Sequence, residues 1–203
     1  MAERARDSAV ERRIIAAAVR LFAAQGFDAT SVQEIVAEAE VTKGALYHYF
    51  SSKNELLYEI YHSLLSRQLA DLDRILGEGM PPDETVRAVI AELVETTTGS
   101  IDEVKVYVRE MHRLDRAHQE AIRTQRRRYH VTFRDFIESA QVSGVFTAFA
   151  SADTVTFIVF GMINEIPAWY RTAGRKTPAE IAEEVSGFVL AALIPRAVTA
   201  AAE

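Results

Sequence analysis

The sequence predicts an all-α protein of about nine helices, in which an N-terminal group of short helices precedes a larger helical domain. Two observations carry this prediction. Apolar residues recur at three- and four-residue spacing along nearly all of the 203 residues, which is the period of an amphipathic α-helix. The 9 glycines and 5 prolines gather at a few places between these stretches. We place a domain boundary after residue 54, which gives domains of residues 1–54 and 55–203.

The first three helices are expected to follow one another closely. The first ends at Gly26, because glycine readily takes the left-handed conformation found at helix C-termini; its apolar face holds Val10, Ile14, Ala17, Leu21 and Phe22. The hydroxyls of Thr30 and Ser31 are expected to cap a second helix, whose apolar face holds Val32, Ile35, Val36 and Ala39. Thr42 then caps a third helix, with Leu46 and Phe50 on its apolar edge.

A much longer helix follows, opening at Ser51 or Ser52 and ending near Gly77 to Gly79. One apolar stripe runs along it through Leu56, Leu57, Ile60, Tyr61, Leu64, Leu65, Leu69, Leu72 and Leu76. After Pro81 and Pro82, Asp83 is expected to start a helix that Gly99 stops.

The rest of the chain yields four more expected helices. Ser100 and Glu103 form a capping box for a segment that carries Val104, Val108, Met111 and Leu114. A further segment with Tyr129, Phe133, Phe136, Ile137 and Ala140 ends before Gly144. The most apolar helix follows around Val155, and apolar residues around its circumference predict burial on several sides. The last helix begins with an N-cap, a first-turn proline and a capping-box acid, namely Thr177, Pro178 and Glu180.

Composition limits the possible functions. The chain is 49% hydrophobic and 26% charged with a net charge of -6, which is typical of a soluble globular protein. The absence of cysteine excludes a disulfide framework, a zinc ribbon and a thiol nucleophile. The longest apolar run, Phe157 to Ile163, is far shorter than the roughly 18 residues of a membrane span. The charged start does not resemble a signal peptide, so we expect a cytoplasmic protein that does not bind membranes.

The second and third helices, joined by a short turn, have the arrangement of a helix-turn-helix motif. The third helix places Lys43, Gly44, Tyr47 and His48 on one side. Gly44 lets the backbone approach DNA closely, and the other three side chains can hydrogen-bond phosphates or base edges. Further phosphate contacts are expected at helix N-termini, from Thr30, Ser31, Thr42 and Lys53. Because the whole chain is acidic, binding to nucleic acid must come from such a local surface.

The stretch from Thr30 to Phe50, continued by Ser51 to Leu57, resembles the signature of TetR-family transcriptional regulators. Leu21 to Phe27 resembles the end of that family's first helix and its turn, so the resemblance covers about residues 10–60. It implies that the third helix lies in the major groove of an operator duplex. It also implies base or phosphate contacts from Gln33, Thr42, Lys43, Gly44, Ala45, Tyr47, His48 and Tyr49, and phosphate anchoring by Thr30, Ser31 and Lys53.

One residue departs from the family pattern, because Glu40 stands where the turn usually carries glycine. A residue other than glycine at positive φ costs on the order of 1 kcal/mol. Residues 1–55 hold seven Lys and Arg against eight Asp and Glu. DNA binding is therefore expected to depend on the orientation of a few groups, not on bulk positive charge.

A subunit that reads a few base pairs gains specificity by dimerising over a palindrome. The resemblance implies that the last two helices, from about Ala152 to Tyr170 and from Pro178 to Pro195, form a four-helix bundle with a second copy. The alternative is that their apolar faces serve the core of one chain.

A small-molecule effector is expected in the larger domain, in a mostly apolar setting with a few polar groups. The predicted ligand-binding residues are Met111, Arg126, Phe133, Phe136, Phe157, Phe160, Gly161, Asn164 and Trp169. Asp153 to Gly174, followed by Thr177 to Glu180, resembles the C-terminal domain of TetR-type regulators of fatty-acid and sterol degradation. Members of that group respond to acyl-coenzyme A thioesters, whose phosphates need cations such as Arg126. The alternative for Arg123, Arg126, Arg127 and Arg128 is a solvated helix face.

Catalysis finds little support in the sequence. The chain has no nucleophile elbow, no glycine-rich phosphate loop and no histidine spacing for a metal, so we predict neither enzyme activity nor a metal or cofactor. The sequence is best interpreted as a homodimeric repressor that a ligand releases from DNA. One alternative is a repressor of drug efflux that senses an aromatic or cationic compound. The other is an all-α enzyme or protein-interaction module that has kept the motif without using it.

Overall fold

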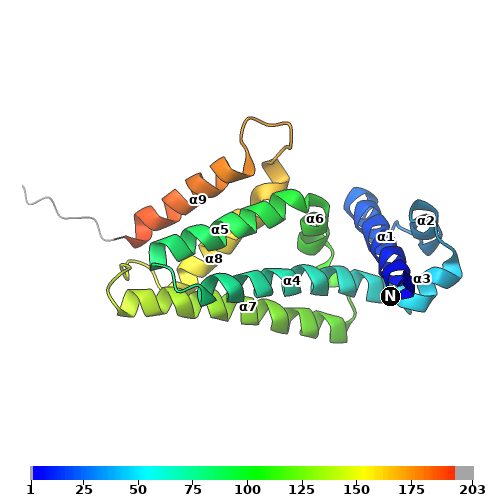
Figure 1. The fold of residues 1–203 in the computed structure, drawn as a ribbon, viewed down its shortest axis with the longest axis horizontal. Helices are drawn as coiled ribbons and strands as arrows, with labels where there is room; N and C mark the ends of the chain where they lie inside the picture. The colour runs from blue at the N-terminus through cyan, green and yellow to red at the C-terminus, as the bar shows by residue number, and fades with distance from the viewer. Residues whose placement is uncertain (1, 195–203) are drawn as a thin grey trace, which may run out of the picture. The chain divides into compact units, whose positions relative to one another are not determined.

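The computed structural model describes residues 2–194, with side chains described from residue 9 onward. Over these residues the chain forms nine α-helices, one short 3-10 helix and no strand (Figure 1), which confirms the predicted all-α fold. The elements are α1 (Ala2–Gln25), α2 (Val32–Glu38), α3 (Lys43–Tyr49), α4 (Lys53–Gly77), α5 (Pro82–Gly99), α6 (Ile101–Arg109), η1 (Met111–Arg113), α7 (Arg116–Val142), α8 (Ala152–Trp169) and α9 (Pro178–Leu193).

The described residues divide into two compact units that alternate along the chain. Residues 2–67 and 100–126 form the first unit, and residues 68–99 and 127–194 form the second. Helices α4 and α7 each contribute residues to both units. The predicted boundary after residue 54 divides the chain by expected function and not by compactness. It therefore stays a prediction.

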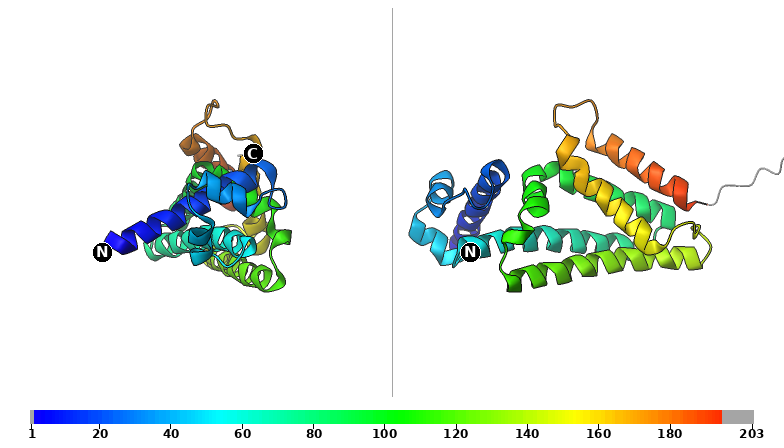
Figure 2. Two further views of the ribbon diagram at one scale, coloured as in Figure 1. Left: turned by 90° about the vertical axis from the view of Figure 1, so that its right-hand side faces the viewer. Right: turned by 180° about the vertical axis from the view of Figure 1, so that it is seen from behind.

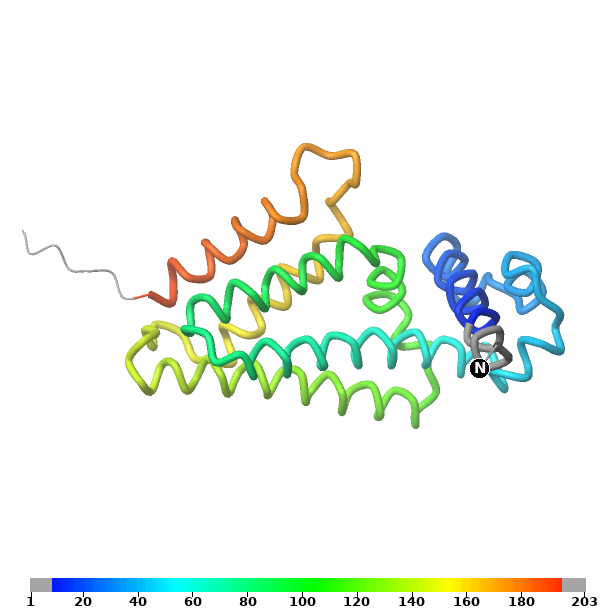
Figure 3. The backbone as a smooth tube through the Cα atoms, in the orientation of Figure 1, coloured from blue at the N-terminus to red at the C-terminus, as the bar shows by residue number. Residues whose placement is uncertain are grey.

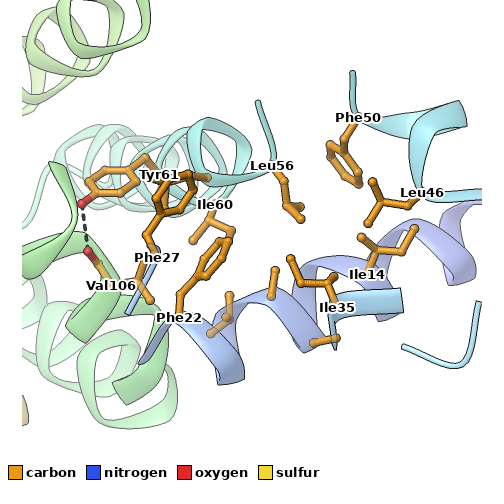
Figure 4. Close-up of a cluster of buried hydrophobic side chains, with 14 of the residues drawn as sticks. Ile14, Phe22, Phe27, Ile35, Leu46, Phe50, Leu56, Ile60, Tyr61 and Val106 are labelled. Carbon is orange, nitrogen blue, oxygen red and sulfur yellow. Dashed lines mark hydrogen bonds between the residues drawn. The ribbon is translucent and has the colours of Figure 1, made fainter. Parts of the chain in front are cut away.

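The first unit is organised around one hydrophobic core. Figure 4 shows how α1, α2, α3, α4 and α6 each supply side chains to it, including Ile14, Ile35, Leu46, Leu56 and Val106. Beside these residues, the hydroxyl of the fully buried Tyr61 donates 2.8 Å hydrogen bonds to the carbonyls of Val106 and Tyr107. Burial raises the pKa of Tyr61 well above its usual range, so the phenol stays protonated and keeps α4 bonded to α6.

The predicted helix starts are confirmed at three places. Ser31 and Glu34 form a reciprocal capping box at α2, and Thr177 and Glu180 form another at α9. The Thr42 hydroxyl accepts the Ala45 N–H at 3.1 Å and caps α3. Figure 3 traces the backbone from α2 through its turn into this short helix.

The sequence is misleading around residue 100. The capping box expected from Ser100 and Glu103 is absent, because the Ser100 side chain makes no capping hydrogen bond and the Glu103 carboxylate pairs with Arg67 of α4 instead. The segment expected to run on to Leu114 also breaks, because α6 ends at Arg109 and η1 follows as a separate turn. Val108, expected on the apolar face, is exposed.

In the second unit, α5 packs against α8 and α9, and Figures 1 and 2 show α9 running alongside α5. The buried face of α8 carries Val155, Val159 and Ile163, while its opposite side leaves Phe157 and Ile158 exposed. The composition of α8 predicted burial on several sides. Within one chain, only one side of the helix is buried.

Candidate nucleic-acid interface

Helix α3 presents its polar side chains on one face. Thr42, Lys43, Gly44, Tyr47 and His48 are exposed. The Lys43 ammonium lies 5.8 Å from the centre of the Tyr47 ring, whose side chain is 46% exposed. Ala45 and Tyr49 are half-buried, and the Tyr49 ring meets His48 edge to face. The structure thus brings together the residues that the sequence assigned to a recognition helix.

The opposite side of α3 is anchored in the core of the first unit. Leu46 is fully buried and Phe50 is nearly so, and both belong to the cluster drawn in Figure 4. Because two large side chains fix the helix from behind, the exposed face has a defined direction. This rigidity is what a surface for reading base edges needs.

The N-terminus of α2 uses its polar groups internally. The Ser31 N–H donates to Glu34 at 2.7 Å, and the Ser31 hydroxyl accepts the Glu34 N–H at 3.2 Å. The backbone and side-chain hydrogen bonds from Ser31 and the bond from Gln25 lower the pKa of the Glu34 carboxyl. Ser31 and Gln33 remain exposed, so both stay candidates for DNA contact.

Thr30 is placed differently from the expectation. Its side chain is buried, with 1% exposed, and its hydroxyl donates to the Gly26 carbonyl at 2.8 Å. The Gln25 amide in turn donates to this hydroxyl at 3.3 Å. The expectation that Thr30 caps α2 is therefore corrected, because Ser31 is the N-cap and Thr30 fixes the turn between α1 and α2. Its phosphate contact stays a prediction.

Lys53 also serves the fold. Its ammonium donates 2.7 Å hydrogen bonds to the carbonyls of Phe27 and Thr30 and lies 4.2 Å from the centre of the Phe27 ring. Two of the three N–H donors of the half-buried side chain are thus used within the chain. Its predicted phosphate contact stays a prediction, and its visible role is to hold the α1–α2 turn against α4.

The turn between α2 and α3 confirms the unusual backbone expected at Glu40. Glu40 has φ 51 and is the one residue other than glycine with positive φ among those the structure describes. The Glu40 N–H donates to Ala37 and the Val41 N–H donates to Val36. This pair of bonds is a Schellman motif, in which the left-handed position is usually taken by glycine.

The predicted effector residues fall in both units. In the first unit, Met111 packs against the hydrophobic core, and the Arg126 guanidinium lies 5.5 Å from the centre of the Tyr107 ring. In the second unit, the Phe133 ring meets Phe136 at 6.3 Å and Phe160 at 5.6 Å between centres. The structure brings these three aromatic residues together, and their contact with an effector stays a prediction.

The other predicted effector residues of the second unit face outward or lie at its edge. Gly161 and Trp169 are exposed, Asn164 is half-buried, and the Phe157 side chain is 65% exposed. A groove of about 390 Å³ lies elsewhere in this unit, between the end of α4, α5 and the start of α9. It is lined by small and charged residues such as Ala88, Ala182, Glu92 and Arg74, and by none of the predicted effector residues.

Sequence reasoning considered His130 only as a metal ligand and did not predict its aromatic surroundings. The structure places its ring 4.3 Å from Phe157 and 5.9 Å from Phe160 between centres. Its Nε2 is buried and has no hydrogen-bond partner among the described residues. Burial lowers the pKa of His130, against a smaller opposing effect of Asp153.

The described residues 2–194 offer no cluster of metal ligands. No group of three or more His, Cys, Asp and Glu side chains among them has the placement to hold a metal ion. No helix among them is long and apolar enough to cross a membrane.

Two family models match the chain. One, for bacterial regulatory proteins of the tetR family, matches residues 14–60, which contain α2, the turn and α3. The other, for a tetracyclin repressor-like C-terminal domain, matches residues 79–193, more than half of the chain.

Similar proteins extend over most of the chain. It is 25% identical over 185 residues to the uncharacterized HTH-type transcriptional regulator YdgC of Bacillus subtilis (strain 168), covering 91% of this chain and 93% of that protein. It is 25% identical over 181 residues to the HTH-type transcriptional repressor KstR2 of Rhodococcus jostii (strain RHA1), covering 85% of each. The crystal structure of AibR in complex with isovaleryl coenzyme A and operator DNA is 26% identical, with a TM-score of 0.78 over 88% of this chain and 97% of that one.

Proposed function

The chain belongs to the TetR family of bacterial transcriptional regulators, and we propose that it is a repressor that binds a palindromic operator as a homodimer and leaves it on binding an acyl-coenzyme A thioester. The observation that carries this proposal is the exposed face of α3, where Lys43, Tyr47 and His48 stand over the buried anchors Leu46 and Phe50. Such a face can enter a major groove and hydrogen-bond phosphates and base edges. Because an operator-binding repressor acts where the DNA is, the proposal includes a cytoplasmic location.

The outward faces of α8 and α9 support dimerisation. Phe157, Ile158 and Phe188 leave between 50% and 69% of their side chains exposed. Each of these helices also contains a glycine, Gly161 in α8 and Gly187 in α9, and a Cβ built on either one meets no described atom within 4 Å beyond its own stretch of helix. A glycine inside a helix costs about 0.5–1 kcal/mol relative to alanine. Among the residues that the structure describes, no close neighbour requires glycine at either position.

Close approach of a second copy accounts for both features of these two helices. Helices approach one another most closely where small residues face the partner, and exposed aromatic side chains around them supply apolar area to bury. The end of the predicted bundle at Pro195 lies outside the described residues. The proposed interface therefore consists of the exposed face of α8 and that of α9 up to Leu193.

The class of effector is supported by the relatives and by the chain's own chemistry. AibR, similar along most of this chain, was crystallised with isovaleryl coenzyme A and operator DNA together. In this chain, Phe133, Phe136 and Phe160 supply apolar surface for an acyl group. Two exposed arginines of α7 in the same unit, Arg127 and Arg128, offer guanidinium groups to the phosphates of the coenzyme.

Release from DNA is proposed to follow a shift between two conformations. In the first conformation, the two α3 helices of the dimer have the spacing of successive major grooves. In the second, their spacing is wider or rotated. The effector binds the second conformation more tightly and so lowers the affinity for DNA. Helix α4 is the proposed lever, because its residues 53–67 belong to the first unit and its residues 68–77 to the second. A ligand that displaces one end of a continuous helix displaces the other.

The decisive experiment is fluorescence anisotropy of the purified protein on the duplex upstream of its own gene, with long-chain acyl-coenzyme A titrated into the complex. We expect tight binding and release at micromolar thioester, with no release by free coenzyme A. Tight binding that an aromatic cation releases, and the thioester does not, would favour a repressor of drug efflux. Failure to bind any duplex at low salt would contradict the proposed function.

A further inference from the structure

The C-terminus of α2 carries a strained residue and lacks a cation of its own. Glu40 occupies the left-handed position of the Schellman motif with φ 51, a conformation that disfavours every side chain with a Cβ. The last turn of α2 contains no basic residue to interact with its carbonyl groups. In a Schellman motif the carbonyls of Ala39 and Glu40 receive no hydrogen bond from the helix itself.

Arg13 of α1 supplies both missing interactions. Its Nε and Nη2 donate to the Ala39 carbonyl at 2.9 and 2.6 Å, and Nη2 also donates to the Glu40 carbonyl at 2.5 Å. A planar guanidinium is suited to this task, because its fork of N–H groups reaches two neighbouring oxygens at once. The positive charge also lies at the end of α2 where the helix dipole is negative.

We propose that Arg13 is a positioning residue, which holds the turn after α2 in its left-handed conformation and thereby sets the direction of α3. The turn links Ala39 to Thr42, the cap of α3, through only two residues, so its backbone angles determine where the recognition helix points. A chain with glycine at position 40 would not need this support. The inference rests on the proposed function only in its consequence for DNA affinity.

Arg20 provides a matched control on the same helix. It lies seven residues from Arg13, on the same side of α1, and its Nη2 pairs with the Glu38 carboxylate of α2 at 2.9 Å. R13Q and R20Q each remove one positive charge and one contact from α1 to α2. Only R13Q removes hydrogen bonds to the backbone of the turn.

The first measurement needs no DNA. It is amide hydrogen exchange of Val41, whose N–H closes the Schellman motif on the Val36 carbonyl. We expect R13Q to speed this exchange about tenfold. R20Q should change it less than about threefold, because ion pairs between exposed side chains contribute little to stability. In the E40G background, R13Q should change it less than about threefold, because the unstrained turn holds itself. R13K, which keeps one donor group, should restore part of the protection.

The second measurement is fluorescence anisotropy on the duplex upstream of the gene. R13Q should weaken binding about tenfold, and R20Q should weaken it less than about threefold. Adding R13Q to E40G should weaken the binding of the E40G variant less than about threefold. Equal effects of R13Q and R20Q on exchange would overturn the proposal, as would an undiminished effect of R13Q in the E40G background. Thermal unfolding of each variant separates loss of the turn from loss of the fold. If hydrogen exchange changes as expected but the protein binds no duplex, the role of Arg13 in the turn stands and the proposed function fails.

Discussion

Tyr47 is the residue whose removal tests the recognition helix most directly. Its ring stands on the exposed face of α3 with the Lys43 ammonium 5.8 Å from its centre, and it has no part in the core. We expect Tyr47→Ala to weaken binding to the upstream duplex at least about tenfold, because each lost base or phosphate contact is worth about 1–3 kcal/mol. The measurement is anisotropy, with dimerisation followed by sedimentation.

Phe149 provides the control for this variant. Its side chain is 88% exposed and belongs to the second unit, so Phe149→Ala removes an exposed aromatic ring without touching α3. We expect duplex binding to be unchanged. Equal affinities of the Tyr47 variant and the parent chain would show that α3 is not the helix that reads DNA.

His130 predicts a dependence of stability on pH. Because burial lowers its pKa, the folded chain binds this proton less readily than the unfolded chain does. Stability should therefore fall as pH drops through the ordinary histidine range, near about 6.5. Asp153 opposes this effect and Arg134 reinforces it, and both lie close to the ring.

His130→Phe tests this sign. The aromatic setting of Phe157 and Phe160 accepts a phenyl ring, and the variant removes a buried nitrogen that has no partner among the described residues. We expect urea unfolding to show a smaller loss of stability between pH 7 and pH 5 in the variant than in the parent chain. The same loss in both proteins would mean that other groups cause the acid sensitivity.

At the scale of single helices, capping is the interaction most open to test. Ser31→Ala removes the hydroxyl that accepts the Glu34 N–H and should cost about 1 kcal/mol of unfolding free energy. The pKa of Glu34 is lowered by its bonds to Ser31, so the cap's contribution is present above the ordinary glutamate range and is lost as pH falls through it.

Ser100→Ala is the matched control for this cap. Both serines precede a helix and both are followed three residues later by glutamate, but only Ser31 makes the bonds of a capping box. We expect Ser100→Ala to change the unfolding free energy by less than about 0.5 kcal/mol. Chemical denaturation at pH 7 compares the two variants, and similar losses would contradict the role given to Ser31.

The comparison of these two serines shows what local sequence can and cannot predict. Helix periods and the caps at Ser31, Thr42 and Thr177 depend on neighbouring residues, and the sequence predicted them. The left-handed backbone at Glu40 was expected from the family resemblance, because the turn usually carries glycine there. Ser100 was misread because Glu103 has a stronger partner in Arg67, which is 36 positions away in the chain.

The same limit applies to the candidate site. The exposed face of α3 followed from helical spacing, since Leu46 and Phe50 had to be buried. The tertiary roles of Thr30 and Lys53 did not follow, because their partners are backbone carbonyls that only the folded turn presents. Nor did sequence spacing show that Phe157 and Trp169 lie on exposed surface.

At the scale of the whole molecule, the prediction concerns assembly. Phe188→Asp places a charge on the exposed face of α9, within the proposed interface between copies, where a desolvated unpaired carboxylate is strongly unfavourable. We expect the variant to sediment as a monomer at micromolar concentration, with operator affinity lowered at least about tenfold because both half-sites are no longer bound together.

Val108→Asp serves as the control for assembly. Val108 is 51% exposed on α6, which belongs to the first unit, whereas α8 and α9 belong to the second. The variant should sediment as the parent protein does. A Phe188 variant that remains dimeric would refute the assignment of the interface to α8 and α9.

The bond between Arg13 and the turn after α2 has a consequence for how this sequence can vary. Under this proposal, glycine at position 40 relaxes the requirement at position 13, whereas glutamate at position 40 is best supported by the guanidinium there. An ancestor that held glycine could acquire Arg13 at little cost and replace the glycine afterwards, but the reverse order passes through a chain with a weakened turn. Among descendants of such a lineage, the two positions should therefore be inherited as a pair.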